Sequence, residues 1–246
     1  MIDTRLVLAP NPGPMTLDGT NTWLLSAPGG RTVLVDPGPD DPAHLDRVRE
    51  EAGDIALVLL THGHPDHSAG ARVFAQQAGV PVRAVDPTHR LGDEGLGDGE
   101  HVTVDDLVVT VLATPGHSSD SVCFVLPEQG MVLTGDHVLG RGTTGVAHPY
   151  GRLRDYLDSL HRRADVGATT LLPGHGPVID NAAEVIAYYV THRRERLAQV
   201  AAAVEAGAAT PREVVERVYA DVDRRLWPAA EQSVRAQLDY LAETRD

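Results

Sequence analysis

Apolar residues in the first two-thirds of the chain come in short runs bounded by Gly, Pro and Asp. Such runs are typical of strands, which we expect at 6–8, 23–26, 32–36, 55–60, 102–113, 122–126 and 131–134. Helical patterns lie between them, at 42–52, 68–78 and 153–163. Strands mixed with helices predict an α/β (α+β) fold.

From about Asp180 the pattern becomes helical throughout. We expect three helices, and the second begins at Thr210-Pro211-Arg212-Glu213, where a capping box precedes a helix with proline at its first position. The sequence therefore predicts a main domain over residues 1–180 and a helical subdomain over residues 181–246 that packs onto it.

The chain has 246 residues, 42% of them hydrophobic and 23% charged, which is sufficient for a sizeable core. Its longest aliphatic run, 55–60, is far shorter than the roughly 20 residues that span a bilayer, and its first residues show no signal-peptide pattern. The lone cysteine, Cys123, lies in an apolar stretch and is expected to be a free thiol. We expect a cytoplasmic protein that does not bind a membrane.

The net charge is −14, from 35 acidic residues and 21 arginines, and the chain contains no lysine. An acidic exterior repels nucleic acids on average. Residues 181–246 are nearly balanced, with 9 arginines and 11 acidic residues, so this tail is the part least unfavourable to a nucleic acid. We expect Arg193, Arg194 and Arg196 on a solvated helix face.

A histidine-rich loop follows the apolar run 55–60, with the sequence Thr61-His62-Gly63-His64-Pro65-Asp66-His67. Gly63 and Pro65 prevent regular helix in the loop, and Ser68 is expected to cap the helix after it. Three imidazoles and a carboxylate within six residues are the donor set that a borderline-soft cation such as Zn²⁺ prefers. A loop of unconnected surface histidines is the less favoured interpretation.

Three further candidates each follow a strand and stand beside small residues, which let the backbone turn sharply. They are His117, Asp136 and His175. Together with the loop residues they form a set sufficient for two metal ions with one bridging carboxylate: His62, His64, Asp66, His67, His117, Asp136 and His175.

This set, in this order, resembles the metallo-β-lactamase superfamily. The resemblance implies an αββα sandwich with two metals at one edge of the paired sheets. It also implies that His62, His64 and His117 hold one metal, that Asp66, His67 and His175 hold the other, and that Asp136 bridges them. Asp36, at the end of the strand at 32–36, matches a carboxylate that orients a ligand imidazole.

Antibiotic hydrolysis is disfavoured, because β-lactamases of this superfamily typically place a cysteine where this chain has Asp136. The Asp66-His67 pair and Asp136 are similar to the glyoxalase II type of site. Over the whole chain the resemblance is to the β-lactamase-like endoribonucleases. It rests on the segments 11–14, 17–22, 139–144 and 173–179. In those relatives three C-terminal helices continue into a winged-helix-like hairpin, and we expect a truncated form of that appendage here.

For the mechanism we expect a hydroxide bridging the two metals to attack a carbonyl or phosphoryl centre, with Asp66 and Asp136 as the catalytic carboxylates. Two Zn²⁺, two carboxylates and a hydroxide leave a centre of about +1, which attracts anions. Iron or manganese also suits these donors. His148 and Tyr150 are candidates for the proton donor, and Thr143 and Thr144 either line the substrate pocket or shape a turn. His137 is expected to point away from the site. His44, His89, His101, His161 and His192 are expected at the surface.

The leading hypothesis is a dinuclear zinc hydrolase of a small anionic ester or thioester. A single-strand-specific endoribonuclease is the alternative, with RNA as its partner. A third hypothesis, from another class, is a non-catalytic nucleic-acid-binding module in which metal only stabilises the fold. The sequence does not indicate the oligomeric state.

Overall fold

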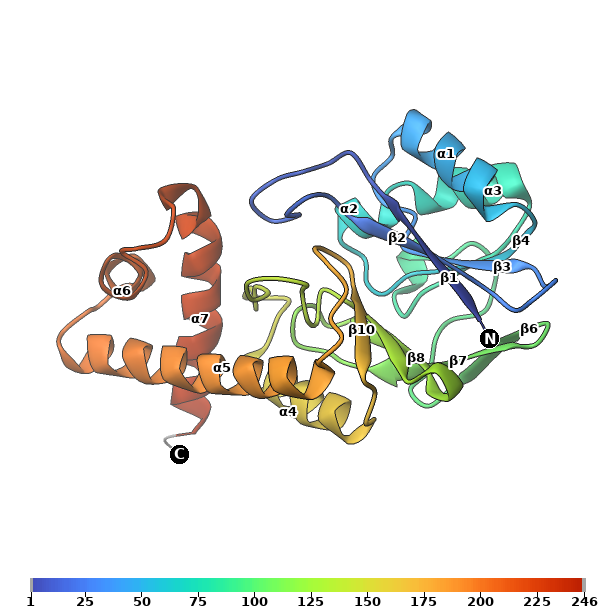
Figure 1. Ribbon diagram of the computed structural model, residues 1–246. Helices are drawn as coiled ribbons and strands as arrows, with labels where there is room; N and C mark the ends of the chain where they lie inside the picture. The colour runs from blue at the N-terminus through green and yellow to red at the C-terminus, as the bar shows by residue number, and fades with distance from the viewer. Residues whose placement is uncertain (1, 245–246) are drawn as a thin grey trace.

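Two five-stranded sheets pack face to face in the computed structural model, which describes residues 2–244 (Figure 1). In the first sheet the strand order is β1-β2-β3-β4-β5, and in the second it is β10-β9-β8-β7-β6. The first sheet comprises β1 (Asp3–Leu8), β2 (Asn21–Ser26), β3 (Thr32–Val35), β4 (Ile55–Leu59) and β5 (Val82–Arg83). The second comprises β6 (His101–Val104), β7 (Leu107–Ala113), β8 (Val122–Leu126), β9 (Met131–Gly135) and β10 (Thr170–Pro173).

Helices cover both outer faces of the paired sheets. On the first sheet lie α1 (Pro42–Ala52) and α3 (Ala71–Ala78), and on the second lie α4 (Leu153–Asp165) and the first half of α5 (Ala182–Glu205). Apolar residues of both sheets form a central core that contains Trp23, Leu107 and Phe124. The predicted αββα sandwich is therefore confirmed.

Parallel pairing brings the functional loops to one edge of the sandwich. β3 and β4 run parallel in the first sheet, and β9 and β10 run parallel in the second. The carboxyl ends of parallel strands lie at the same edge of a sheet. The indole N–H of Trp23 and the amide of Asn21 both donate to the carbonyl of Pro173, at 3.0 and 2.9 Å, and so join the two sheets beside that edge.

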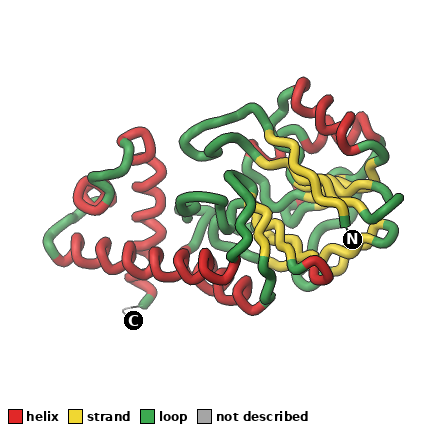
Figure 2. The backbone as a smooth tube through the Cα atoms, viewed as in Figure 1, coloured by secondary structure: helices red, strands yellow, loops and turns green. Residues whose placement is uncertain are grey.

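The 24-residue helix α5 connects two hydrophobic cores. Its first half contributes Ala182 and Tyr189 to the core above the second sheet, and its second half contributes Val200 and Ala203 to a separate helical core. That second core also contains residues of α6 (Pro211–Val218) and α7 (Trp227–Glu243), and these helices stand apart from the sheets at one end of the molecule (Figure 2). The predicted cap of α6 is present, because the hydroxyl of Thr210 accepts from the N–H of Glu213 at 3.2 Å.

Several expectations were wrong in detail. The single strand expected at 102–113 is a hairpin, β6 and β7, that turns at Asp105 with a positive φ of 51°. Ser68 does not cap a helix: it ends the short helix α2 (Pro65–Ser68), whose first residue is Pro65, where a missing N–H costs nothing. Strands β5 and β10 were not predicted, because two and four residues are too few to form a recognisable hydrophobic pattern.

Two polar side chains expected at the surface are buried. His44 is enclosed because its Nε2 lies 3.0 Å from the carbonyl oxygen of Pro37 and 3.1 Å from the hydroxyl of Thr22. Arg193 of α5 is buried against Tyr156 of α4, whereas its neighbour Arg194 is exposed. Among the described residues, no helix is long and apolar enough to cross a bilayer.

Candidate metal centre

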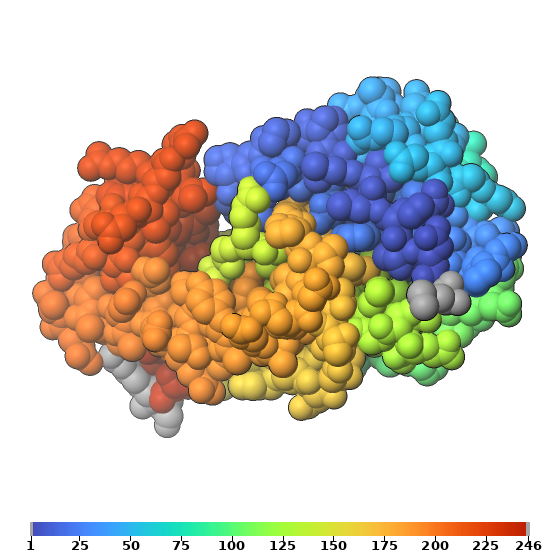
Figure 3. Space-filling model, in the orientation of Figure 1, coloured from blue at the N-terminus to red at the C-terminus, as the bar shows by residue number. Residues whose placement is uncertain are grey.

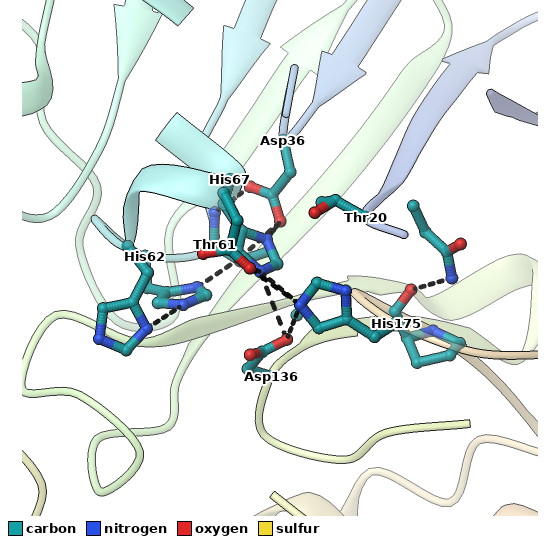
Figure 4. A network of polar contacts seen from close by, with 12 residues as sticks. Thr20, Asp36, Thr61, His62, His67, Asp136 and His175 are labelled. Carbon is teal, nitrogen blue, oxygen red and sulfur yellow. Dashed lines mark hydrogen bonds and ion pairs between the residues drawn. The ribbon is translucent and has the colours of Figure 1, made fainter. Parts of the chain in front are cut away.

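Seven histidine and aspartate side chains converge at the edge where the strands end. Figure 4 labels four of them, His62, His67, Asp136 and His175. His62 and His64 lie in the turn after β4, and Asp66 and His67 lie on α2. His117 follows β7, Asp136 follows β9, and His175 follows β10. The structure therefore brings together all seven residues that the sequence singles out, from the ends of four strands of the two sheets and from helix α2.

One half of the centre consists of three imidazoles. His62 Nε2 lies 2.9 Å from His64 Nδ1, and His117 Nε2 lies 3.0 Å from the same atom. Three nitrogens thus point at a common position.

The other half contains a carboxylate and two imidazoles. His67 Nε2 lies 3.2 Å from His175 Nε2, which lies 3.1 Å from Asp66 Oδ2. Asp136 stands between the halves. Its Oδ1 is 3.4 Å from both His67 Nε2 and His175 Nε2, and its Oδ2 is 3.7 Å from His117 Nε2. One carboxylate therefore faces both clusters.

Each outward-facing nitrogen of four of these histidines has an acceptor that fixes its ring. His67 Nδ1 donates to Asp36 Oδ2 at 2.9 Å. The hydroxyl of Thr61 donates to the same carboxylate oxygen at 2.6 Å and accepts from His62 Nδ1 at 3.1 Å. Asp36 is buried and thus orients one imidazole directly and a second through Thr61.

The remaining two rings are held by backbone carbonyls. His117 Nδ1 donates to the carbonyl of Gly145 at 2.8 Å and lies 3.1 Å from the hydroxyl of Thr144. His175 Nδ1 donates to the carbonyl of Gly19 at 3.0 Å. Because the outer nitrogens carry the protons of neutral rings, the inner nitrogens present lone pairs to the centre.

Whether the residues suit a metal ion can be judged from the inner atoms that lack a hydrogen-bond donor. His64 Nδ1 can donate to only one of the two nitrogens beside it, and the inner nitrogens of His67 and His175 face each other as acceptors unless one binds an extra proton. Asp136 Oδ1 is buried without a hydrogen-bond partner among the described residues. A cation satisfies all these atoms at once, and nitrogen donors mixed with carboxylates suit a borderline-soft divalent metal.

The pKa values of the histidines also depend on the charges of the neighbouring aspartates and on burial. Burial opposes a charge on His67, yet the carboxylates of Asp136 and Asp36 raise its pKa well above the usual value. Burial is likewise overcome at His175, where the adjacent carboxylates of Asp136 and Asp66 raise the pKa to about 9. In the other half, burial lowers the pKa of His62 well below its usual value. A positive charge is therefore favoured between the aspartates.

Glycines make the close approach possible. A Cβ on Gly174 would come within 2.7 Å of the His67 ring and 2.8 Å of Asp136 Oδ1. A Cβ on Gly135, which has a φ of +48°, would meet Thr61 Oγ1 at 2.6 Å. Both positions therefore admit only a hydrogen in place of a side chain.

The other sequence candidates lie around this centre rather than in it. Thr144 is buried against His117, and Thr143 precedes it in the same loop. His148 pairs with Asp239 of α7 at 3.6 Å, and Tyr150 is 74% exposed. No hydrogen bond or ion pair within residues 2–244 joins His148 or Tyr150 to the seven residues. His137 points away, as expected, and packs against Tyr156.

Sequence reasoning missed the groups that hold the rings in place. Thr61 stands directly between a strand and a candidate ligand, so its position was a usable signal. The carbonyl groups of Gly19 and Gly145 carry no such signal, because any residue has a carbonyl and only the fold places it.

Comparison with known proteins agrees with this geometry. Residues 15–175 match the family profile described as "Metallo-beta-lactamase superfamily", which covers more than half of the chain. The chain belongs to this superfamily. It is a hydrolase of that superfamily, and the histidine and aspartate cluster described above is its candidate metal-binding site. Residues 210–244 match a second profile, "Beta-lactamase associated winged helix domain".

Several known proteins are similar to this chain over most of its length. The Caenorhabditis elegans protein named "Beta-lactamase-like protein 2 homolog" is 34% identical over 96% of this chain and 82% of its own length. An "Atrochrysone carboxyl ACP thioesterase" from Aspergillus fumigatus is 34% identical over 87% of this chain and 72% of its own length. A metallo-beta-lactamase family protein from Thermus thermophilus has a solved structure with a TM-score of 0.83 and 26% identity, over 98% of this chain and 93% of that one.

Proposed function

We propose that the protein is a dinuclear zinc hydrolase of a small anionic ester or thioester. In this proposal one ion is bound by His62, His64 and His117, the other by Asp66, His67 and His175, and Asp136 binds both. The observation that carries the proposal is the position of Asp136, whose two oxygens face the two clusters at 3.4 and 3.7 Å.

Two divalent cations in such a site supply a water nucleophile at neutral pH and a Lewis acid for the attacked carbonyl oxygen. The protein's part is to fix the arrangement. Asp36 and Thr61 hold two of the rings, and the side chain of Asp136 is only 10% exposed. Asp66 is the more accessible carboxylate, with 28% of its side chain exposed, and we assign it the role of orienting the water.

The substrate class follows from charge. The exterior is acidic, with a net charge of −14, which disfavours a long polyanion, whereas a locally cationic centre attracts a small anion. A thioester needs little help from a proton donor because a thiolate leaves readily. The 34% identity to a protein named as a thioesterase supports this class. Thr143, Thr144, His148 and Tyr150 stay our candidates for substrate contacts.

A single-strand-specific endoribonuclease is the second candidate. Its supporting observation is the match of residues 210–244 to a winged-helix profile, in the part of the chain where arginines nearly balance acidic residues. RNA binding of this kind weakens steeply with salt, because each phosphate contact releases counterions.

One experiment separates the candidates. Protein loaded with Zn²⁺ is assayed on a panel of anionic thioesters, esters and lactones and, in parallel, on end-labelled single-stranded RNA at two salt concentrations. Turnover of a thioester or ester without RNA cleavage supports the main proposal. RNA cleavage that falls steeply with salt replaces it by the second candidate. Loaded protein that acts on neither contradicts both and favours the non-catalytic module.

A further inference from the structure

The C-terminal helical subdomain contacts the segment that carries the metal-site loops. Tyr189 of α5 accepts from the backbone N–H of Leu139 through its hydroxyl oxygen at 2.9 Å. One turn further along α5, Arg193 donates through Nη2 to the backbone carbonyl of Thr144. Two residues of one helix thus hold the loop 139–144 at both ends.

That loop leads directly to a metal-site imidazole. The hydroxyl of Thr144 and the carbonyl of Gly145 lie 3.1 and 2.8 Å from Nδ1 of His117. They set which nitrogen of His117 carries the proton and where Nε2 points. The backbone of Thr144, in turn, is fixed by Arg193.

Arg193 is a costly residue to place here. Its side chain is only 8% exposed, Nε has no hydrogen-bond partner, and no carboxylate oxygen lies within 4.0 Å of the guanidinium, among the residues that the structure describes. A buried cation without a carboxylate lowers stability unless other contacts compensate. The contacts it has are the carbonyl of Thr144 and the ring of Tyr156, over which it lies at 4.9 Å.

Tyr156 extends the connection to the backbone next to Asp136 and next to His117. Its hydroxyl donates to the backbone carbonyl of His137 at 2.7 Å, one residue after Asp136. Its backbone also packs on Gly116, because a Cβ on that glycine would meet the Tyr156 Cα at 2.3 Å. The guanidinium of Arg193 therefore contacts both Thr144, which lies against the His117 ring, and Tyr156, which packs on the residue before His117.

We propose that Arg193 is a positioning residue that couples the helical subdomain to the half of the centre formed by His62, His64 and His117. This inference rests on the proposed metal site. The rings of the other half have supports of their own, since His67 is oriented by Asp36 and His175 by the carbonyl of Gly19. Loss of Arg193 therefore weakens one metal position and leaves the other intact.

The test is a Zn²⁺ titration against a chelator of known affinity, on metal-free wild type and Arg193→Met, repeated with Co²⁺ to record the absorption of each equivalent bound. Wild type is expected to bind two equivalents tightly. The variant is expected to bind one equivalent as wild type does and the second about 10- to 100-fold more weakly, the range typical when a group supporting a ligand is lost. Arg194→Met, on the exposed side of the same helix, is the matched control and is expected to bind as wild type does.

The outcomes distinguish the two claims. A wild type that binds no metal contradicts the proposed function itself. A wild type that binds two equivalents, together with an Arg193→Met variant that either binds both equally tightly or loses both to the same extent, overturns the positioning role alone. If the methionine variant does not fold, Arg193→Lys takes its place, because it keeps a cation and a donor. Its second equivalent is then expected to bind between the wild-type affinity and a 10-fold loss, and equal weakening of both equivalents overturns the proposal.

Discussion

Oδ2 of Asp36 lies 2.9 Å from Nδ1 of His67, and both side chains are buried. Asp36 has a positive φ of 52°, a backbone conformation that Asn tolerates nearly as well as Asp. Asp36→Asn therefore removes the negative charge while keeping the backbone. We expect metal affinity to fall about 10- to 100-fold with the fold unchanged, measured by chelator competition and far-UV circular dichroism. An affinity equal to that of wild type would show that Asp36 does not support the site.

A matched pair of glycine substitutions tests the packing of the centre. Gly174→Ala places a methyl group against His67 and Asp136, whereas the methyl group of Gly97→Ala meets its nearest atom, Glu100 Oε2, at an ordinary van der Waals distance of 3.7 Å. We expect the first variant to lose metal affinity and activity, and the second to retain both. Metal content after dialysis and the rate of substrate turnover measure the difference. Similar behaviour of the two variants would contradict the close packing at Gly174.

Much of this site could be predicted from the sequence, because dense histidines and aspartates beside glycine and proline are a local pattern. The supports could not. Thr61 and Asp36 are brought to one point only by the parallel pairing of β3 and β4. Arg193 is followed by the charged residues Arg194, Glu195 and Arg196, as on an ordinary helix surface, and only the packing of α4 against α5 determines that it is buried.

Some predictions of the fold were wrong for the same reason, because they depend on contacts between residues far apart in the sequence. His44 was expected at the surface because nothing adjacent to it signals burial, yet the loop after β3 supplies it with the carbonyl of Pro37. The hairpin of β6 and β7 was hidden because Asp105-Asp106 interrupts an otherwise continuous apolar pattern by only two residues. Composition does not reveal contacts that are made over long separations in sequence.

Metal binding should release protons. The pKa values of His67 and His175 are raised in the metal-free protein, so this pair of facing rings holds an extra proton that a metal must displace. Affinity is therefore expected to rise with pH between 7 and about 9, by up to about 10-fold per pH unit for each proton released. Calorimetric titrations in buffers of different ionisation enthalpy measure the number of protons. Binding without proton release would contradict the raised pKa values.

His137 predicts a specific loss of stability in acid. Burial, and then the nearby Arg163, lower its pKa to about 3, whereas the unfolded chain has a value near 6.5. Below pH 6.5 the unfolded state therefore binds a proton that the folded state does not, and the free energy of unfolding falls as pH falls. The contribution approaches about 1.4 kcal/mol per pH unit and ends near pH 3.

Urea unfolding of the metal-free wild type and His137→Leu between pH 7 and 5 checks this expectation. The other titrating groups are common to both proteins, so the variant is expected to lose stability less steeply by about one proton's worth. Equal slopes would show that His137 is protonated in the folded protein.

The space-filling view shows a hollow between the orange and red C-terminal helices and the blue N-terminal part of the chain (Figure 3). Residues of the segment 139–149 protrude into this hollow.

The central claim is that Asp136 bridges two metals that together hydrolyse the substrate. The most direct measurement is the rate of thioester hydrolysis by wild type and Asp136→Ala, each with its bound zinc counted and its circular dichroism recorded. We predict two zinc ions and turnover in the wild type, and fewer than two ions and a rate at background in the variant, with the same secondary structure in both. An Asp136→Ala protein that keeps two zinc ions and a rate within 10-fold of the wild type would contradict the account.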